Sequence, residues 1–181
     1  MAAIGPRIVI ADTSVLVNFL RVDAMAMLGR LSKQIVITEH VEAEVAEHYE
    51  VQRGRLLAAL KQNFVSQVAL TSVGELAMFG RLAANGRLGA GECAAIACAV
   101  SGSHVLAIDD RRAIAEAQRI QVSLPIIRTE DLVVMLIREG VVSVTNADGI
   151  KAVWETEHRF RLAFKSFAEL LQAHGPETAL E

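Results

Sequence analysis

Short apolar runs alternate along the chain with longer stretches in which apolar residues recur every three or four positions. The short runs are rich in β-branched residues, which is typical of strands buried on both faces. They are RIVIA at 7–11, QIVIT at 34–38, FVSQVAL at 64–70, HVLAI at 104–108 and LPIIR at 124–128. The periodic stretches between them predict helices. Strands that alternate with helices favour an α/β domain built around a parallel sheet.

Capping residues and glycines set the expected ends of the helices. Thr13 or Ser14 is expected to cap a helix over VLVNFL, and Thr38 a helix that begins with EHVEAEV. Further helices are predicted over GRLLAALKQ, over residues 72–85, from GAGEC to Gly102, over RRAIAEAQRI, and from TEDLV to Gly140. The sequence from Asn146 to about Ala173 predicts one long amphipathic helix, with Trp154, Phe160, Phe164 and Phe167 as its apolar anchors. We expect residues 1–140 to form the α/β domain and residues 141–181 a C-terminal helical extension packed on or beside it.

Composition narrows the class of protein. With 181 residues, of which 52% are hydrophobic, the chain can form one domain with a full core. The formal net charge is −3, so a polyanionic partner would have to meet a local basic patch. Cys93 and Cys98 lie about 140° apart on a helix, which favours small buried side chains over a disulfide. No signal segment or long apolar run is evident, so we expect a cytoplasmic protein without membrane association.

Four acidic residues follow strands or begin helices in a way that brings them to one edge of the predicted sheet. Asp12 ends the first strand, and Asp109 ends HVLAI. Glu44 lies on the helix after the second strand, and Glu92 lies in the first turn of the glycine-led helix. Ligands bind at the carboxyl edge of such sheets. Because clustered carboxylates repel one another, a hard divalent cation such as Mg²⁺ would explain the cluster and would support phosphodiester hydrolysis.

Each acid also has a purely structural explanation. Asp12 could cap the helix that follows it, and Glu92 could complement the dipole of its own helix. Glu44 could lie on a solvated helix face, where Glu39, Glu42 and Glu47 compete with it for a role in the site. We expect Asp109 to face the site and Asp110 to cap the next helix, because adjacent residues at a strand end point in different directions.

The stretches VIADTSVLVNFL, IVITEHVEAEV, LGAGECAAIACA and VLAIDDRRAIAEA together resemble the PIN-domain family, especially the VapC-type toxin ribonucleases. The resemblance covers roughly residues 7–140 and implies a three-layer α/β/α sandwich with a central parallel sheet. It also implies metal-dependent endonucleolytic cleavage of RNA, and commonly a cognate antitoxin that restrains it. Relatives are often homodimers, and the apolar tail could serve dimerisation, partner binding or core burial.

The resemblance assigns roles to individual residues. Asp12, Glu44, Glu92 and Asp109 match the catalytic acids that bind Mg²⁺ or Mn²⁺. Thr13 or Ser14 matches the hydroxyl position beside the first acid, and both are expected to contact the substrate. Many members have Asp where this chain has Glu92, so the third carboxylate is carried on a side chain one methylene longer.

Substrate contacts are less sharply indicated by the sequence. Arg111 and Arg112 could contact phosphates beside the metal, as could Arg81 and Arg87, although a solvated surface explains these residues equally well. A haloacid-dehalogenase-like phosphatase would need an aspartate where Ser14 stands, and a receiver domain would need its acidic pair at the first strand. The alternative that stays open is a PIN-like protein-interaction module with a weak or silent active site.

Overall fold

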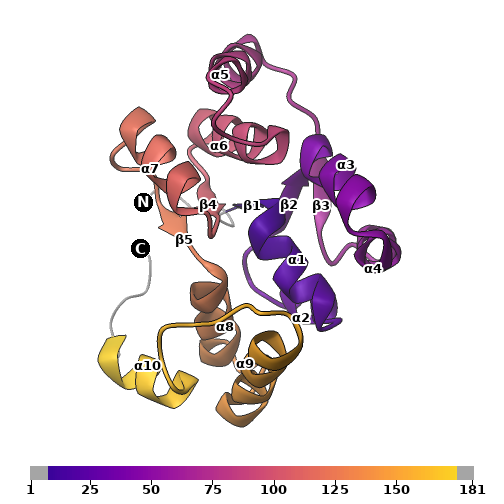
Figure 1. Cartoon of the computed structure of the whole chain (residues 1–181), viewed down its shortest axis with the longest axis vertical. Coiled ribbons are helices and arrows are strands. Elements are labelled where there is room, and N and C mark those ends of the chain that lie inside the picture. Colours follow the sequence, from indigo (N-terminus) through magenta and orange to yellow (C-terminus); the bar gives the residue numbers. More distant parts are fainter. Residues whose placement is uncertain (1–7, 175–181) are drawn as a thin grey trace, which may run out of the picture.

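A five-stranded parallel sheet forms the centre of the computed structural model, which describes residues 8–174 (Figure 1). Its strands are β1 (Val9–Ala11), β2 (Ile35–Thr38), β3 (Ser66–Val68), β4 (Val105–Ala107) and β5 (Ile126–Ile127). Their order in the sheet is β3-β2-β1-β4-β5, and every neighbouring pair is parallel. All five predicted strands are confirmed, although each is shorter than its apolar run. Arg7, expected in the first strand, lies outside the described residues.

Ten helices connect and cover these strands within the described residues. Those before β3 are α1 (Thr13–Arg21), α2 (Met25–Leu28), α3 (Glu39–His48) and α4 (Glu50–Lys61). Those between β3 and β5 are α5 (Val73–Ala84), α6 (Ala90–Gly102) and α7 (Arg111–Ile120). Those after β5 are α8 (Thr129–Arg138), α9 (Val144–Glu157) and α10 (Phe167–His174). None of these described helices is both long enough and apolar enough to span a membrane.

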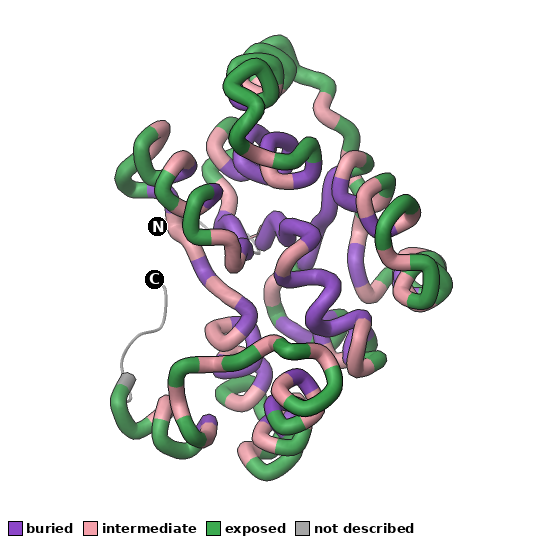
Figure 2. Tube along the Cα trace, viewed as in Figure 1, coloured by how far each residue is buried: buried purple, intermediate pink, exposed green. Residues whose placement is uncertain are grey.

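The sheet has a hydrophobic core on each face, which confirms the three-layer α/β/α sandwich. Successive strand residues alternate between the two cores, as the pleat requires: Val9 and Ala11 enter one, and Ile10 enters the other. Helices α6 and α7 cover the face that Ile10 enters, with α5 packed on the outside of α6, and α1, α3, α4 and the helices after β5 lie on the opposite side (Figure 1). Figure 2 shows that the sheet, much of α1 and part of α6 are buried. Cys93 and Cys98 are free thiols on α6 and are buried in the core that this helix covers, as expected.

The prediction of one long helix over the C-terminal tail is wrong. Helix α9 ends at Glu157, an irregular segment follows, and α10 begins at Phe167. The chain turns at Arg159, whose φ is +55°, and the N–H of Phe160 donates to the carbonyl of Trp154 at 3.0 Å. The rings of Phe160 and Trp154 meet edge to face, with centroids 5.5 Å apart. The aromatic spacing therefore reflects burial against the core and not continuous helix. The division between residues 1–140 and 141–181 stays a prediction.

Candidate active site

Asp12 is a buried carboxylate at the end of β1, only 1% exposed. It is the N-cap of α1, which corrects the expectation that Thr13 or Ser14 takes this position. Its Oδ2 accepts hydrogen bonds from the N–H of Ser14 at 3.0 Å and from the Ser14 hydroxyl at 2.7 Å. Its Oδ1 is buried and has no hydrogen-bond partner in the protein. The capping explanation is thus confirmed for one oxygen, and the other oxygen has no role in the cap.

The surroundings of Asp12 oppose its ionisation. Burial raises the pKa of Asp12 from 3.8 to about 6, and the hydrogen bonds from Ser14 offset part of this rise. The negative charge of Glu44 adds to the increase. A carboxyl group with a raised pKa, packed beside a second acid, favours binding of a cation.

Glu44 reaches the same place from α3, the helix that Thr38 caps as predicted. The hydroxyl of Thr13 donates to Oε2 of Glu44 at 2.9 Å, which joins the first turn of α1 to α3. The competing acids on this helix lie elsewhere: Glu39 and Glu47 are exposed, and Glu42 accepts a hydrogen bond from Gln67.

Gly91 allows the close approach of α6 to this pair. A Cβ at position 91 would lie 2.2 Å from Oε2 of Glu44 and 3.0 Å from Oγ1 of Thr13. A Cβ at Gly89 would make only ordinary contacts, at 3.7 Å from Glu44 and 3.8 Å from Glu92. A side chain at position 91 would therefore displace the carboxylate of Glu44, so this arrangement of the acids needs a glycine there.

Glu92 is the half-buried acid contributed by α6. Its Oε2 accepts a hydrogen bond from the N–H of Gly89 at 2.8 Å, so its structural role at the helix N-terminus is confirmed. Burial raises the pKa of Glu92, the Gly89 bond lowers it in part, and the charges of Asp12, Asp110 and Glu44 raise it further. Glu92 therefore lies close enough to the other three carboxylates for their charges to act on it.

Asp110 caps α7, as the sequence predicts. Its Oδ1 accepts hydrogen bonds from the N–H groups of Arg112 at 2.8 Å and Ala113 at 3.0 Å. Its side chain is 34% exposed. The two arginines assigned to substrate contacts, Arg111 and Arg112, are exposed in the first turn of the same helix.

Asp109 has different surroundings from those the sequence suggests. Its Oδ2 accepts hydrogen bonds from the Thr129 hydroxyl at 2.7 Å and the Asn18 amide at 3.1 Å. Its Oδ1 accepts one from the N–H of Thr129 at 3.0 Å, and Nε of Arg128 lies 3.9 Å away. The carboxylate therefore connects α1 to the start of α8. Sequence reasoning missed these three partners, which no motif marks.

The two hydroxyls beside Asp12 are engaged with acids. Thr13 donates to Glu44, and Ser14 donates to Asp12 while accepting a hydrogen bond from the N–H of Asp109 at 3.1 Å. Ser14 therefore connects the ends of β1 and β4. In this arrangement both hydroxyls hold the acidic side chains in place.

The donor set suits a hard divalent cation. It consists of carboxylate and hydroxyl oxygens, which Mg²⁺ and Mn²⁺ prefer, and one buried carboxylate oxygen of Asp12 is unpaired. Within residues 8–174, no group of three or more Asp, Glu, His or Cys side chains is arranged, as it stands, so that it could hold a metal ion. Asp12, Glu44 and Glu92 fit such an ion because their donors are oxygens and because the charge of Glu44 acts on the ionisation of Asp12 and the charges of both act on that of Glu92.

Fold and site together define an α/β protein with acidic residues at the carboxyl edge of its sheet. The family model described as "DUF3368: PIN domain" matches residues 8–176, so the chain belongs to this PIN-domain family. PIN domains are generally nucleases and usually use divalent metals.

Comparison with individual proteins adds little to this assignment. No curated protein matches the chain. Among solved structures, the chain is similar to one in the crystal structure of VapBC2 from Rickettsia felis bound to a DNA fragment from their promoter. The two share 15% sequence identity over 67% of this chain and 98% of the other, with a TM-score of 0.46.

Proposed function

We propose that the protein is an endoribonuclease that hydrolyses RNA phosphodiester bonds with Mg²⁺ or Mn²⁺. Membership of a family whose members are generally nucleases supports hydrolysis of nucleic acid. The observation that carries the metal-dependent mechanism is Asp12, a buried carboxylate with one unpaired oxygen among electrostatically coupled acids.

Asp12, Glu44 and Glu92 are the acids that would hold the cation. When bound, the ion would lower the pKa of a water molecule and offset charge on the leaving oxygen. The chain's own part is to position the carboxylates: Ser14 fixes Asp12, and Thr13 fixes Glu44.

For the fourth acid, the sequence favours Asp109 and the contacts favour Asp110. Both oxygens of Asp109 are engaged by Thr129 and Asn18, whereas Asp110 acts electrostatically on Glu92. We therefore assign the fourth metal position to Asp110. Asp109 then acts as a positioning residue between α1 and α8.

We also propose that the protein is the toxin of a toxin–antitoxin pair and that it forms homodimers, on the strength of the VapC-type motifs. Co-expression with the product of a small neighbouring reading frame tests the first point, since a cognate antitoxin should co-purify and inhibit cleavage. Sedimentation of the purified protein tests the second.

The decisive experiment is cleavage of a broad RNA panel by the purified protein with Mg²⁺, with Mn²⁺ and with EDTA. We expect cleavage with either ion and none in EDTA. Glu44→Gln should abolish cleavage, whereas Glu47→Gln, on the exposed side of the same helix, should not. Undiminished cleavage in EDTA would refute the metal mechanism. No cleavage of any RNA, together with tight binding of a protein partner, would favour the interaction module.

A further inference from the structure

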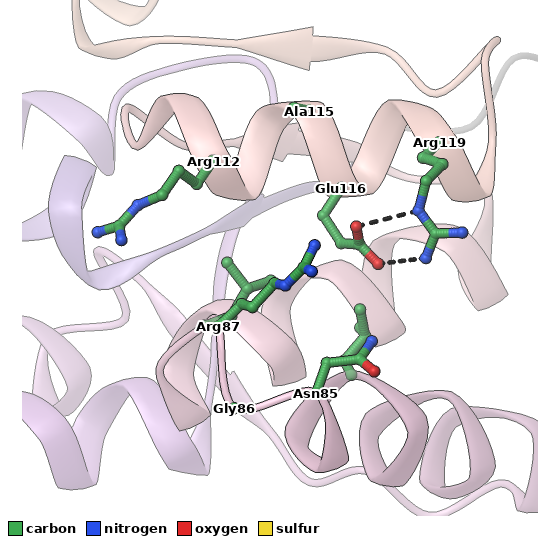
Figure 3. A pocket seen from close by; sticks show the side chains of 9 residues that line it. Asn85, Gly86, Arg87, Arg112, Ala115, Glu116 and Arg119 are labelled. Carbon is green, nitrogen blue, oxygen red and sulfur yellow. Dashed lines mark hydrogen bonds and ion pairs between the residues drawn. The ribbon is translucent and has the colours of Figure 1, made fainter.

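A cavity of about 610 Å³ lies between α7 and the segment that joins α5 to α6 (Figure 3). Arg87, Arg112 and Arg119 line it, with the side chains of Leu82 and Leu88. An adjoining cavity of about 770 Å³ shares Leu82 and Arg119 and adds Arg81. We call this continuous surface, with its arginines 81, 87, 112 and 119, the arginine groove.

The arginine groove is strongly basic in a chain whose net charge is −3. Among the described residues that line it, Glu116 is the one acid, and it is paired with Arg119 through two hydrogen bonds, one of 3.1 Å. Figure 3 shows Arg87 extending from the loop toward Glu116. The positive charges of Arg119 and Arg87 lower the pKa of Glu116, with the Arg119 hydrogen bond the largest effect. The groove therefore keeps a positive excess even where its acid lies.

One end of the arginine groove adjoins the acidic site. Nε of Arg112 lies 4.0 Å from Oδ1 of Asp110, the acid assigned to the fourth metal position. Leu88 directly precedes Gly89, whose N–H holds the carboxylate of Glu92. A polymer lying along the groove would therefore arrive at the carboxylates.

We propose that the arginine groove binds single-stranded RNA on one side of the phosphodiester that is cut. This inference rests on the proposed function and names the surface that holds the substrate's flanking nucleotides. Guanidinium groups bind phosphates through paired hydrogen bonds and stack on nucleobases, and the leucines offer an apolar surface to base faces. An acidic protein segment would match the charge, but it would not explain why the groove opens onto a phosphodiester-cleaving site.

Binding of a fluorescein-labelled single-stranded RNA in EDTA tests this proposal without requiring cleavage. Each phosphate contact contributes a slope of about 0.7 to the dependence of log affinity on log salt, which is roughly fivefold in affinity at 0.1 M salt. The double variant Arg81→Gln/Arg87→Gln, which removes two arginines that Glu116 does not hold, should therefore bind roughly 25-fold more weakly, with a slope smaller by about 1.4. The matched control, Arg30→Gln/Arg53→Gln, removes two exposed arginines outside the groove and should bind like the wild type.

Glu116→Gln provides a test that poor folding cannot imitate. It removes the acid of the groove and releases Arg119, so RNA should bind roughly fivefold more tightly, through one more phosphate contact. Equal binding by the groove and control variants, or unchanged or weaker binding by Glu116→Gln, would overturn the proposal. The proposal would also be overturned if an oligoglutamate peptide displaced the labelled RNA at a lower concentration than unlabelled RNA does. That result would identify the groove as a docking surface for an acidic protein. RNA binding without cleavage would refute the proposed endoribonuclease function but would still support RNA binding by the arginine groove.

Discussion

Replacing Asp12 with asparagine should stabilise the metal-free protein while it abolishes cleavage. The side chain is 1% exposed, and its Oδ1 has no hydrogen-bond partner in the protein. Ionisation of such a group is costly, because burial removes the water that would solvate the charge. Asparagine has nearly the same shape, carries no charge, and can still accept the capping hydrogen bond from the N–H of Ser14.

The size of the effect follows from the pKa of Asp12. A rise from 3.8 in the unfolded chain to about 6 in the folded protein corresponds to about 3 kcal/mol of lost stability once the group is ionised. The asparagine loses charge assistance in its bonds with Ser14, which costs about 1 kcal/mol. We therefore expect Asp12→Asn to be about 2 kcal/mol more stable than the wild type above pH 6.

The direction of the pH dependence is fixed by the same shift. Between about pH 3.8 and pH 6 the folded protein binds more protons at Asp12 than the unfolded chain does, so the wild type loses stability as the pH rises through this range. Below this range Asp12 is protonated in both the folded and the unfolded state, so its burial does not lower the free energy of unfolding. The advantage of Asp12→Asn should therefore appear between pH 4 and pH 6 and level off above.

Urea unfolding in EDTA at pH 4, 5, 6 and 8 measures this difference directly. Asp23→Asn is the matched control, since it removes a charge whose side chain is 75% exposed and should show no comparable gain. Added Mg²⁺ should raise the unfolding midpoint of the wild type and leave that of Asp12→Asn unchanged. If Asp12→Asn is less stable than the wild type at pH 8, the capping role dominates and the argument from burial is wrong.

Two further pairs of variants test the site. Gly91→Ala should reduce cleavage strongly with little loss of stability, because its Cβ displaces the flexible carboxylate of Glu44, whereas Gly89→Ala should keep most of the activity in the same RNA assay. Asp110→Asn should abolish cleavage yet melt like the wild type, since asparagine is an equally good cap. Asp109→Asn should lower the free energy of unfolding by about 1–3 kcal/mol, because its amide cannot accept all the hydrogen bonds that Asn18 and Thr129 donate to Asp109, and it should still cleave RNA. Loss of cleavage in Asp109→Asn with unchanged stability would return the fourth metal position to Asp109.

The strand ends could be predicted from sequence because they depend on local patterns. A β-branched apolar run followed by an acid indicates where a buried strand stops, and this placed Asp12 and Asp110 in their observed positions as a strand end and a helix cap. The choice of Glu44 among the acids of α3 depended on the family motif. Which side of α3 faces α6 is set by tertiary packing, and the local sequence does not reveal it.

The partners of Asp109 and the shape of the tail were beyond local patterns. Asn18 is 91 positions away from Asp109 in sequence, and nothing near either residue signals that they meet. In the tail, aromatic residues at helical spacing suggested one helix. Phe160 and Phe164 pack against the core from an irregular segment, because hydrophobic spacing records burial and not backbone conformation.

The structural and functional explanations of the acids turn out to be compatible. Asp12 caps α1, Glu92 accepts a bond at the start of α6, and Asp110 caps α7. The positive ends of three helix dipoles therefore meet where these carboxylates gather, which offsets part of the repulsion among them. The capping bonds use Oδ2 of Asp12, Oε2 of Glu92 and Oδ1 of Asp110. Capping thus orients each side chain through a single oxygen. At Asp12 the second oxygen is left buried and unpaired, which is the arrangement that a divalent cation would complete.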